Sequence, residues 1–194
     1  MSTHLSDDRF AGASPRFRAR LAGIFYLVNI ITSLIAFSGK GSHWLMVVSG
    51  LAATASYITV TALLYYLFKP VNPTVSLTAA LFSLLGCAVG VLAPLHLFPF
   101  HIHSLVFFGF YCLLIGYLIL RSTFMPRILG VLMAMAGLGW LSFVYQPLAK
   151  YLTPYHYIMG GIGEGLLTLW LLVMGVNAGR WEKQATNSRE AVSS

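Results

Sequence analysis

The sequence predicts an all-α polytopic membrane protein, a bundle of six transmembrane helices with both chain ends on the cytoplasmic side. Three observations favour this fold class. Of the 194 residues, 58% are hydrophobic and only 9% are charged, whereas about 25% are charged in an ordinary soluble domain. Six apolar segments are each long enough to cross a bilayer. The basic residues, finally, are distributed unevenly between the two sides that these segments define.

Each predicted span has about the 17 to 25 apolar residues that a helix needs to cross the hydrocarbon. Helices are expected because a backbone group without a hydrogen-bond partner is costly there. The six spans are predicted at residues 21–37, 44–68, 74–97, 103–120, 128–145 and 156–177. Their connections are short and contain helix-breaking residues, as in Lys69-Pro70-Val71-Asn72-Pro73. Consecutive helices are therefore expected to be antiparallel neighbours.

The spans form one predicted membrane domain, residues 19–178, between an N-terminal tail, 1–18, and a C-terminal tail, 179–194, that is expected to be disordered. All of the 12 Lys and Arg residues except Lys40 and Lys150 fall in the tails or in the connections on the same side as the tails. Because basic residues stay in the cytoplasm, both tails are predicted to be cytoplasmic. Residues 1–17 lack the apolar core of a secretory signal peptide. The expected location is the bacterial cytoplasmic (inner) membrane.

Charge and motifs exclude several functional classes. The formal charge of +7 orients the protein in its membrane and does not indicate nucleic-acid binding, since no basic run is interleaved with aromatic residues. The chain has no phosphate-binding glycine loop, nucleophile elbow or pair of carboxylates, so a non-enzymatic role is favoured. Cys87 and Cys112 lie in the middle of apolar segments and are interpreted as small packing residues.

One acidic residue, Glu164, falls inside a predicted span. It lies eight residues after His156, the predicted start of the sixth segment, and so about 12 Å into a hydrocarbon core about 30 Å thick. The other acids lie in the tails: Asp7, Asp8, Glu182 and Glu190. An ionised carboxylate at such a depth costs about 2.5–3.5 kcal/mol on insertion scales. Glu164 therefore needs a partner.

No Lys or Arg lies at the depth of Glu164, so its partner is expected to be a neutral polar group, water, a histidine or an ion. Tyr26 and Asn29 of the first span are candidates for a hydrogen bond to this carboxyl group. Tyr157 lies on the same predicted face of the sixth helix as Glu164. These four residues form the predicted site for a proton or a small ligand, because acids inside membrane spans are enriched at functional sites. The alternative is a purely structural hydrogen bond.

The histidines suggest an alternative site for a metal ion. Five of the 6 lie at the outer ends of helices or in the outer connections: His43, His96, His101, His103 and His156. Imidazole binds zinc, copper or iron, so His96, His101, His103 and His156 are candidate ligands together with Glu164. The spacing of His101 and His103 is not the i, i+4 arrangement of a helical metal pair, and no pair lies at the mid-depth that haem requires. No cofactor is therefore predicted.

Three stretches of the chain resemble a known family. They are RLAGIFYL from Arg20, FFGFYCLLIGYLILRSTFMPRILGVLMAMAGLGW from Phe107, and GEGLLTLWLLVMGVN from Gly163. Together they are similar to the bacterial membrane family described as domain of unknown function 4386, over about residues 16–177. The most specific element is the short turn around Pro126, a residue type that suits the first turn of a helix. The resemblance supports the topology and implies no particular reaction.

Three functional hypotheses follow. The first is a membrane protein whose interior, centred on Glu164, binds or moves a proton, a cation or a small ligand that enters from the outer side. The second is a membrane enzyme with a metal at an outer site of histidines and Glu164. The third is a non-catalytic subunit that binds another membrane protein, because small residues such as Gly160 and Gly161 let helices approach closely.

Overall fold

The computed structural model describes residues 14–38, 41–92 and 103–193, and this part of the chain is helical without any strand. Its helices long and apolar enough to cross a membrane are α2 (Pro15–Phe37), α3 (His43–Phe68), α4 (Pro73–Leu92), α5 (Ser104–Arg121), α6 (Arg127–Leu141) together with the 3₁₀ turn that continues it to Val144, and α8 (Tyr155–Val173). The shorter elements are η2 (Ser142–Val144), which extends α6, α7 (Gln146–Tyr151) and α9 (Ala178–Ser193). The prediction of six apolar helices is confirmed.

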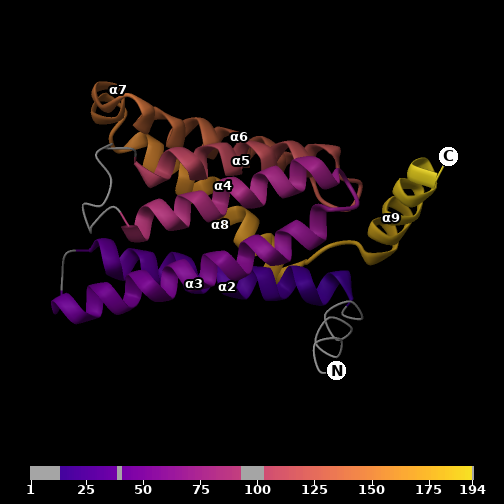
Figure 1. Cartoon of the computed structure of the whole chain (residues 1–194), viewed down its shortest axis with the longest axis horizontal. Helices are drawn as coiled ribbons and strands as arrows, with labels where there is room; N and C mark the ends of the chain where they lie inside the picture. The colour runs from indigo at the N-terminus through magenta and orange to yellow at the C-terminus, as the bar shows by residue number, and fades with distance from the viewer. Residues whose placement is uncertain (1–13, 39–40, 93–102, 194) are drawn as a thin grey trace.

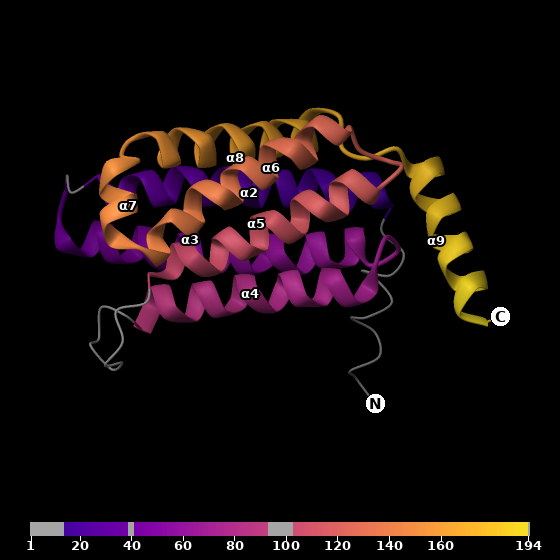
Figure 2. The ribbon, with the colours of Figure 1, turned by 90° about the horizontal axis from the view of Figure 1, so that it is seen from above.

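The six spanning helices form a closed ring in chain order (Figure 1, Figure 2). Each of α2 to α5 packs against the next helix, α6 packs against α8, and α8 returns to α2. Short connections favour this order because they leave consecutive helices antiparallel and side by side. The interior of the ring is filled by side chains from several helices, among them the buried Tyr26, Tyr57 and Tyr111.

The contact between α5 and α6 illustrates how small residues bring membrane helices together. A Cβ atom added to Gly116 would lie 2.7 Å from the carbonyl oxygen of Gly130, and one added to Gly130 would lie 2.7 Å from the carbonyl oxygen of Gly116. No side chain fits in such a space. Because lipid gives no hydrophobic reward for helix association, this close backbone approach supplies the van der Waals contact that holds the pair.

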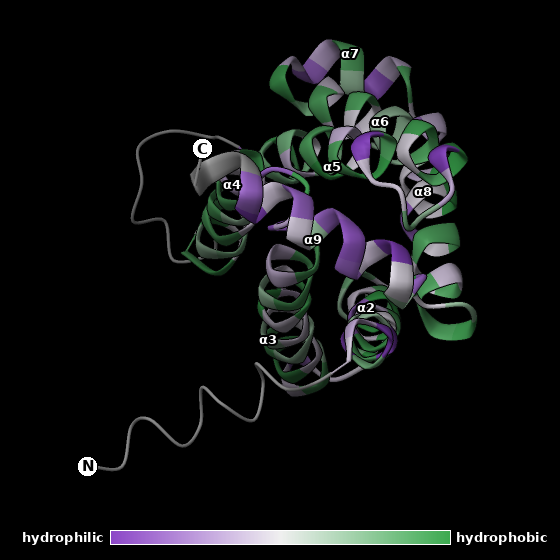
Figure 3. Cartoon of the chain, turned by 90° about the vertical axis from the view of Figure 1, so that its right-hand side faces the viewer, coloured by the Kyte–Doolittle hydropathy of each residue, from purple (hydrophilic) through white to green (hydrophobic). Residues whose placement is uncertain are grey.

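The outer surface of the ring is apolar. Leu34 is 68% exposed, Leu138 is 61% exposed and Val173 is 67% exposed. Figure 3 shows hydrophobic residues along most of the spanning helices, whereas α9 is hydrophilic. Extended apolar faces of this kind are stable against lipid and not against water. The protein is therefore a multi-pass membrane protein.

Several helix boundaries differ from the prediction. α2 begins at Pro15, within the stretch predicted as a tail, because Ser14 accepts a hydrogen bond from the Phe17 amide and proline suits the first turn. The fifth span, predicted to reach residue 145, leaves α-helical geometry after residue 141. α8 ends at Val173 and not at residue 177, since Gly175 takes a φ of 64°. The N-terminal tail up to residue 13 and the predicted end of the third span at residue 97 lie outside the described residues.

The C-terminal segment is helical and not disordered, contrary to the prediction. α9 lies across one end of the ring (Figure 3). The Trp181 indole N–H donates to the carbonyl oxygen of Leu67 at 2.8 Å, and the Ser188 hydroxyl donates to that of Pro70 at 2.6 Å. Contacts of this kind stabilise a helix that is marginal in isolation.

Both ends of the described chain lie at the same end of the ring, which we call the inner end. Arg16 Nε donates to the carbonyl oxygen of Val176 at 3.3 Å and so joins the start of α2 to the residues after α8. Lys69 and Arg121 lie at the inner end as well, where α3 and α5 finish. Lys150 of α7 lies at the opposite, outer end. The basic residues of the described chain thus gather around its termini.

Candidate functional site

Glu164 lies near the middle of α8, the helix that closes the ring between α6 and α2. It is the one acidic residue within the spanning helices that the structure describes. Its side chain points into the ring, where it meets Tyr26 of α2, Cys112 of α5 and Trp140 of α6. Side chains from four helices thus meet at this carboxyl group.

Both oxygen atoms of the Glu164 carboxyl group are hydrogen-bonded. Trp140 Nε1 lies 2.8 Å from Oε1, and the Tyr26 hydroxyl oxygen lies 3.0 Å from Oε2. The Cys112 sulfur lies 3.9 Å from Oε1. Within the described chain, no Lys, Arg or His side chain hydrogen-bonds this group. Neutral donors alone therefore compensate for the partial burial of the acid.

The two main partners of Glu164 differ in hydrogen-bonding capacity. An indole N–H can only donate, so Oε1 acts as an acceptor towards Trp140. A phenol can either donate or accept, so Tyr26 suits Oε2 with or without a proton on it. When the carboxyl group is protonated, Oε2 donates to Tyr26, and when it is ionised, Tyr26 donates to Oε2. The same positions of the heavy atoms serve both protonation states.

A cluster of aromatic side chains continues from Tyr26 through the interior of the ring. The centroid of the Tyr57 ring lies 5.6 Å from that of Tyr26, 5.7 Å from that of Tyr111 and 4.9 Å from that of Phe108, all edge-on. The Tyr111 hydroxyl is buried without a hydrogen-bond partner among the described residues. Because an unpaired buried hydroxyl is costly, this cluster has capacity for one further polar group.

The position of Trp140 depends on a glycine of α8. A Cβ atom added to Gly160 would overlap the Trp140 indole. Gly160 lies four residues before Glu164 and thus on the same side of the helix, so the indole packs on this turn and reaches the carboxyl group. Gly161, which the sequence places on the same face as Gly160, is instead exposed, with no atom within 4 Å of an added Cβ.

Two residues of the predicted site lie apart from the carboxyl group. Asn29 Nδ2 donates to the carbonyl oxygen of Ala53 at 3.0 Å and so joins α2 to α3. Tyr157 is 51% exposed, and its ring lies edge-on to the Trp140 indole at 5.9 Å between centroids. Neither of them hydrogen-bonds Glu164 within the described chain. Of the three predicted neighbours, Tyr26 is the one that the structure brings to the carboxyl group.

The histidines at the outer end have different environments. His156 is buried on α8, and neither of its ring nitrogens has a hydrogen-bond partner within the described chain. His103 caps α5, since its Nδ1 accepts a hydrogen bond from the Leu105 amide at 3.3 Å. Both imidazoles pack on Phe143, with ring centroids 4.8 Å and 4.6 Å from it. Partial burial lowers the pKa of His103 below its usual value of 6.5.

The proposed metal site stays a prediction. His96 and His101 lie outside the described residues, and His43 is exposed at the start of α3. Among the residues that the structure describes, no group of three or more His, Cys, Asp or Glu side chains is placed to hold a metal ion. The use of the His103 Nδ1 atom as a helix cap further removes one lone pair from any such site.

The sequence patterns did not indicate a role for Trp140 and indicated only a packing role for Cys112. A tryptophan close to the end of a span is usually interfacial, and this expectation hides its inward orientation. For Cys112, its position along α5 could have indicated the site. Counting residues from the helix ends at about 1.5 Å each puts Tyr26, Cys112 and Glu164 at similar levels, roughly 12 to 17 Å from the nearer end.

The fold and the site define a class of protein, an α-helical membrane bundle with one acid held by neutral donors in its interior. The chain belongs to the family described as domain of unknown function (DUF4386), whose model matches residues 95–175 and so includes Cys112, Trp140 and Glu164. An uncharacterized protein of Archaeoglobus fulgidus is 30% identical, and the match covers 61% of this chain and 76% of that relative. No solved structure matches the chain.

Proposed function

We propose that this protein binds and releases a proton inside the membrane, with Glu164 as the proton-carrying group. The observation that carries the proposal is the pairing of Oε1 with a group that only donates, Trp140, and of Oε2 with a group that can donate or accept, Tyr26. This pairing lets a proton join or leave Oε2 while the heavy atoms stay in place and only the Tyr26 hydroxyl hydrogen rotates. A site that needs no larger rearrangement is well suited to repeated proton exchange.

The same contacts favour a proton over a metal cation. Calcium takes six to eight oxygen ligands and magnesium about six. Around Glu164, the described neighbours of the carboxyl group present N–H, O–H and S–H groups, from Trp140, Tyr26 and Cys112. These donors compete with a cation for the carboxyl oxygens. A proton needs no further ligand than the oxygen that carries it.

The proposal includes a location and a route. We place the inner end of the ring in the cytoplasm of a bacterium, in the inner membrane, because basic residues gather there. Protons then enter from the outer end, along α8 past His156 and Tyr157, whose rings lie 4.2 Å apart between centroids. A fluorescent protein fused to the C-terminus tests the orientation, since it fluoresces only when its fusion point is cytoplasmic.

Infrared difference spectroscopy on the full chain in lipid nanodiscs tests proton binding. The spectrum in acidic buffer minus that in alkaline buffer is expected to contain the C=O stretch of a protonated carboxylic acid in an apolar environment. This band is expected to shift in D₂O, because the proton exchanges with the solvent. Glu164→Gln is expected to abolish it, since an amide cannot take up a proton in this range.

The matched control is Glu182→Gln, which makes the same chemical change at an exposed acid of α9. It is expected to leave the band unchanged. The proposal is wrong if the wild-type protein has no such band at any pH, or if the band survives in Glu164→Gln. Circular dichroism checks that both variants keep the helical content of the wild-type protein, so that loss of the band reports on the acid and not on unfolding.

A second candidate function, that of an assembly subunit, is favoured by one observation. Gly161 and Gly165 lie four residues apart on α8, and neither has an atom within 4 Å of an added Cβ. This small-xxx-small spacing is typical of faces at which membrane helices associate. The double variant Gly161→Ile/Gly165→Ile is expected to dissociate any oligomer seen by cross-linking in mild detergent. Gly50→Ile, at an equally open glycine of α3, is the control. If the wild-type protein is monomeric in the same cross-linking experiment, self-assembly is excluded.

A further inference from the structure

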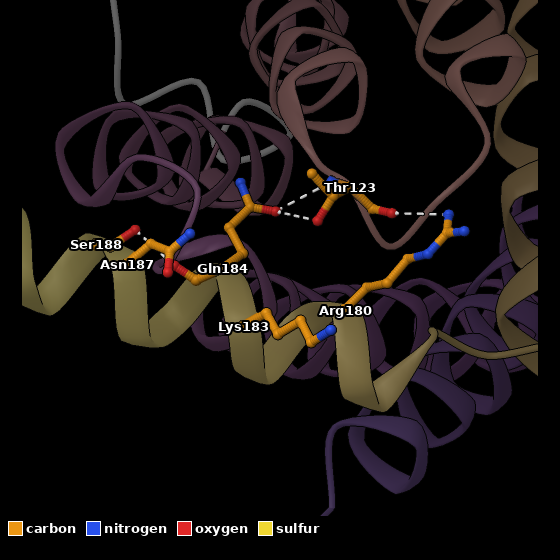
Figure 4. A pocket seen from close by; sticks show the side chains of 6 residues that line it. All are labelled: Thr123, Arg180, Lys183, Gln184, Asn187 and Ser188. Carbon is orange, nitrogen blue, oxygen red and sulfur yellow. Dashed lines mark hydrogen bonds between the residues drawn. The ribbon is translucent and has the colours of Figure 1, made fainter.

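A polar pocket lies at the inner end of the ring, between α9 and the loop that joins α5 to α6 (Figure 4). Gln184 Oε1 accepts hydrogen bonds from the Thr123 amide and the Thr123 hydroxyl, each at 3.0 Å. Arg180 Nη1 donates to the carbonyl oxygen of Thr123 at 3.4 Å. These three bonds fix α9 against the loop. The pocket is thus part of the folded structure and not a gap between independent segments.

The pocket has a volume of about 620 Å³ and is lined by polar and charged side chains. The lining residues are Thr123, Arg180, Lys183, Gln184, Asn187 and Ser188. Two of them are cationic and none is acidic. The lining therefore favours an anion on charge alone.

The hydrogen bonds within the walls use neutral donors of Thr123, Gln184 and Ser188 but leave most of the charged donors free. The oxygen atoms of Gln184 and Thr123 already accept bonds, as described above. Arg180 has five N–H groups and uses one of them within the pocket. The Lys183 ammonium group has three N–H groups and makes no hydrogen bond within the described chain. The pocket therefore presents an excess of charged donors, which suits a ligand that has several acceptor oxygens.

The two cationic side chains lie close together on α9. Arg180 and Lys183 are three residues apart on α9, and Figure 4 shows the Arg180 side chain extending to Thr123 while the Lys183 side chain lies along the helix. Like charges at this spacing repel each other. A phosphate group between them would remove the repulsion and accept charge-assisted hydrogen bonds from both.

The pocket opens at the level at which the membrane spans end. Thr123 lies two residues after Arg121, the last residue of α5. Ser188 bonds to Pro70, which lies two residues after Phe68, the last residue of α3. Ends of spans lie at the polar headgroups of the bilayer, where lipid phosphates are found. A phosphate can therefore reach the pocket without leaving the membrane surface.

We propose that the pocket under α9 binds a phosphate group, supplied by the headgroup of an anionic phospholipid at the inner membrane surface. The phosphate lies between Arg180 and Lys183, and the Asn187 amide provides a further donor from the next turn of the helix. A bound headgroup ties α9 to the bilayer as well as to the ring. This site is independent of Glu164 and does not rest on proton binding there.

Native mass spectrometry of the full chain, released from a neutral detergent with added lipid, tests the proposal. Phosphatidylglycerol is the anionic probe and phosphatidylcholine the zwitterionic one. The wild-type protein is expected to bind phosphatidylglycerol more tightly. Each basic residue near an anionic headgroup strengthens the binding of that lipid. The double variant Arg180→Gln/Lys183→Gln is therefore expected to bind phosphatidylglycerol about tenfold more weakly, or weaker still. Lys150→Gln/Arg189→Gln loses the same charge outside the pocket lining and is expected to stay within about twofold.

A second arm distinguishes a lipid phosphate from a soluble one. The thermal unfolding midpoint of lipid-free protein is measured in inorganic phosphate and in chloride of equal ionic strength. In one outcome, phosphate raises the unfolding midpoint of the wild type and not that of Arg180→Gln/Lys183→Gln, while phosphatidylglycerol is not bound preferentially. That result supports the phosphate site and overturns the lipid as its ligand, which is then a soluble phosphate. The proposal is overturned if the double variant binds phosphatidylglycerol as tightly as the wild type and phosphate has no effect on either protein.

Discussion

Two polar side chains of α8, the half-buried Glu164 and the buried His156, are held in different ways although they lie on the same helix. Each carboxyl oxygen of Glu164 has a hydrogen-bond donor at 3.0 Å or less, whereas neither nitrogen of His156 has any partner among the described residues. The acid is held by polar contacts and the imidazole by ring packing on Phe143 and Tyr157. The comparison shows that burial of a polar group does not identify a site. What identifies it is the set of directed contacts that other helices provide.

Replacing the acid by an apolar residue is expected to have the largest effect on stability. Glu164→Ala leaves Trp140 Nε1 and the Tyr26 hydroxyl without their acceptor, and each unpaired buried donor costs about 1–3 kcal/mol. The free energy of unfolding, measured by titration with a denaturing detergent, is expected to fall by roughly 2–4 kcal/mol. Glu164→Gln keeps an acceptor for Trp140 and is expected to lose less than about 1 kcal/mol. Equal losses in both variants would contradict the role assigned to these contacts.

Displacing the indole of Trp140 is expected to have the next largest effect on stability. Gly160→Ala puts a methyl group where the Trp140 ring lies, so the ring must move away from Glu164. We expect a loss of about 1–3 kcal/mol, as is usual for overpacking. Gly50→Ala adds the same methyl group in open space, where alanine favours a helix over glycine by about 0.5–1 kcal/mol. The two substitutions should therefore change the free energy of unfolding in opposite directions.

The imidazole of His156 is expected to be replaceable. His156→Phe removes two unpaired nitrogens and keeps the ring that packs on Phe143. Because an apolar ring avoids the desolvation cost, the free energy of unfolding should stay unchanged or rise by up to about 1 kcal/mol. His43→Phe, at an exposed position, serves as the control. A loss above about 1 kcal/mol would mean that the nitrogens of His156 have a polar partner, and the contrast with Glu164 would no longer hold.

The smallest expected effect on stability is the pH dependence that comes from the His103 cap. Burial lowers the pKa of His103, so below about pH 6.5 the unfolded chain takes up a proton before the folded chain does. The contribution of this group to stability is therefore complete above that pH and is lost as the pH falls through the lowered pKa. The thermal unfolding midpoint of the wild type should decrease more between neutral and mildly acidic pH than that of His103→Asn. Asparagine caps helices without titrating in this range, so an identical pH dependence in both proteins would contradict the assignment.

The fold was largely predictable from the sequence because the membrane restricts the choices. Apolar length fixes the number of spans, and short connections fix which helices are neighbours. The closing contact between α8 and α2 joins segments far apart in the chain, and no local pattern contains it. α9 was also missed, since its stability comes from tertiary bonds such as that from Trp181 to Leu67 and not from its own apolar content. The cytoplasmic placement of both ends stays a prediction.

The depth of the candidate site in the membrane was predictable, but the orientation of its side chains was not. Counting residues placed Glu164 at mid-depth, and Tyr26 and Asn29 were both named as possible partners. Whether Asn29 or Tyr26 turns towards α8 depends on the rotation of α2 within the ring, which hydropathy does not encode. The role of Trp140 depends on the absence of a side chain at Gly160, a feature of the neighbouring helix. Such pairwise complementarity becomes visible only when both helices are in place.

The closed ring has a consequence for how the protein is made. Ribosomes deliver the chain from its N-terminus, so α2 to α6 are synthesised before α8. Tyr26, Cys112 and Trp140 are thus all available when the segment that carries Glu164 leaves the translocon. The residue that is hardest to insert arrives last, at a gap whose walls already carry its donors. Truncation before α8 would instead leave those donors facing lipid, which gives the cell a basis for recognising incomplete chains.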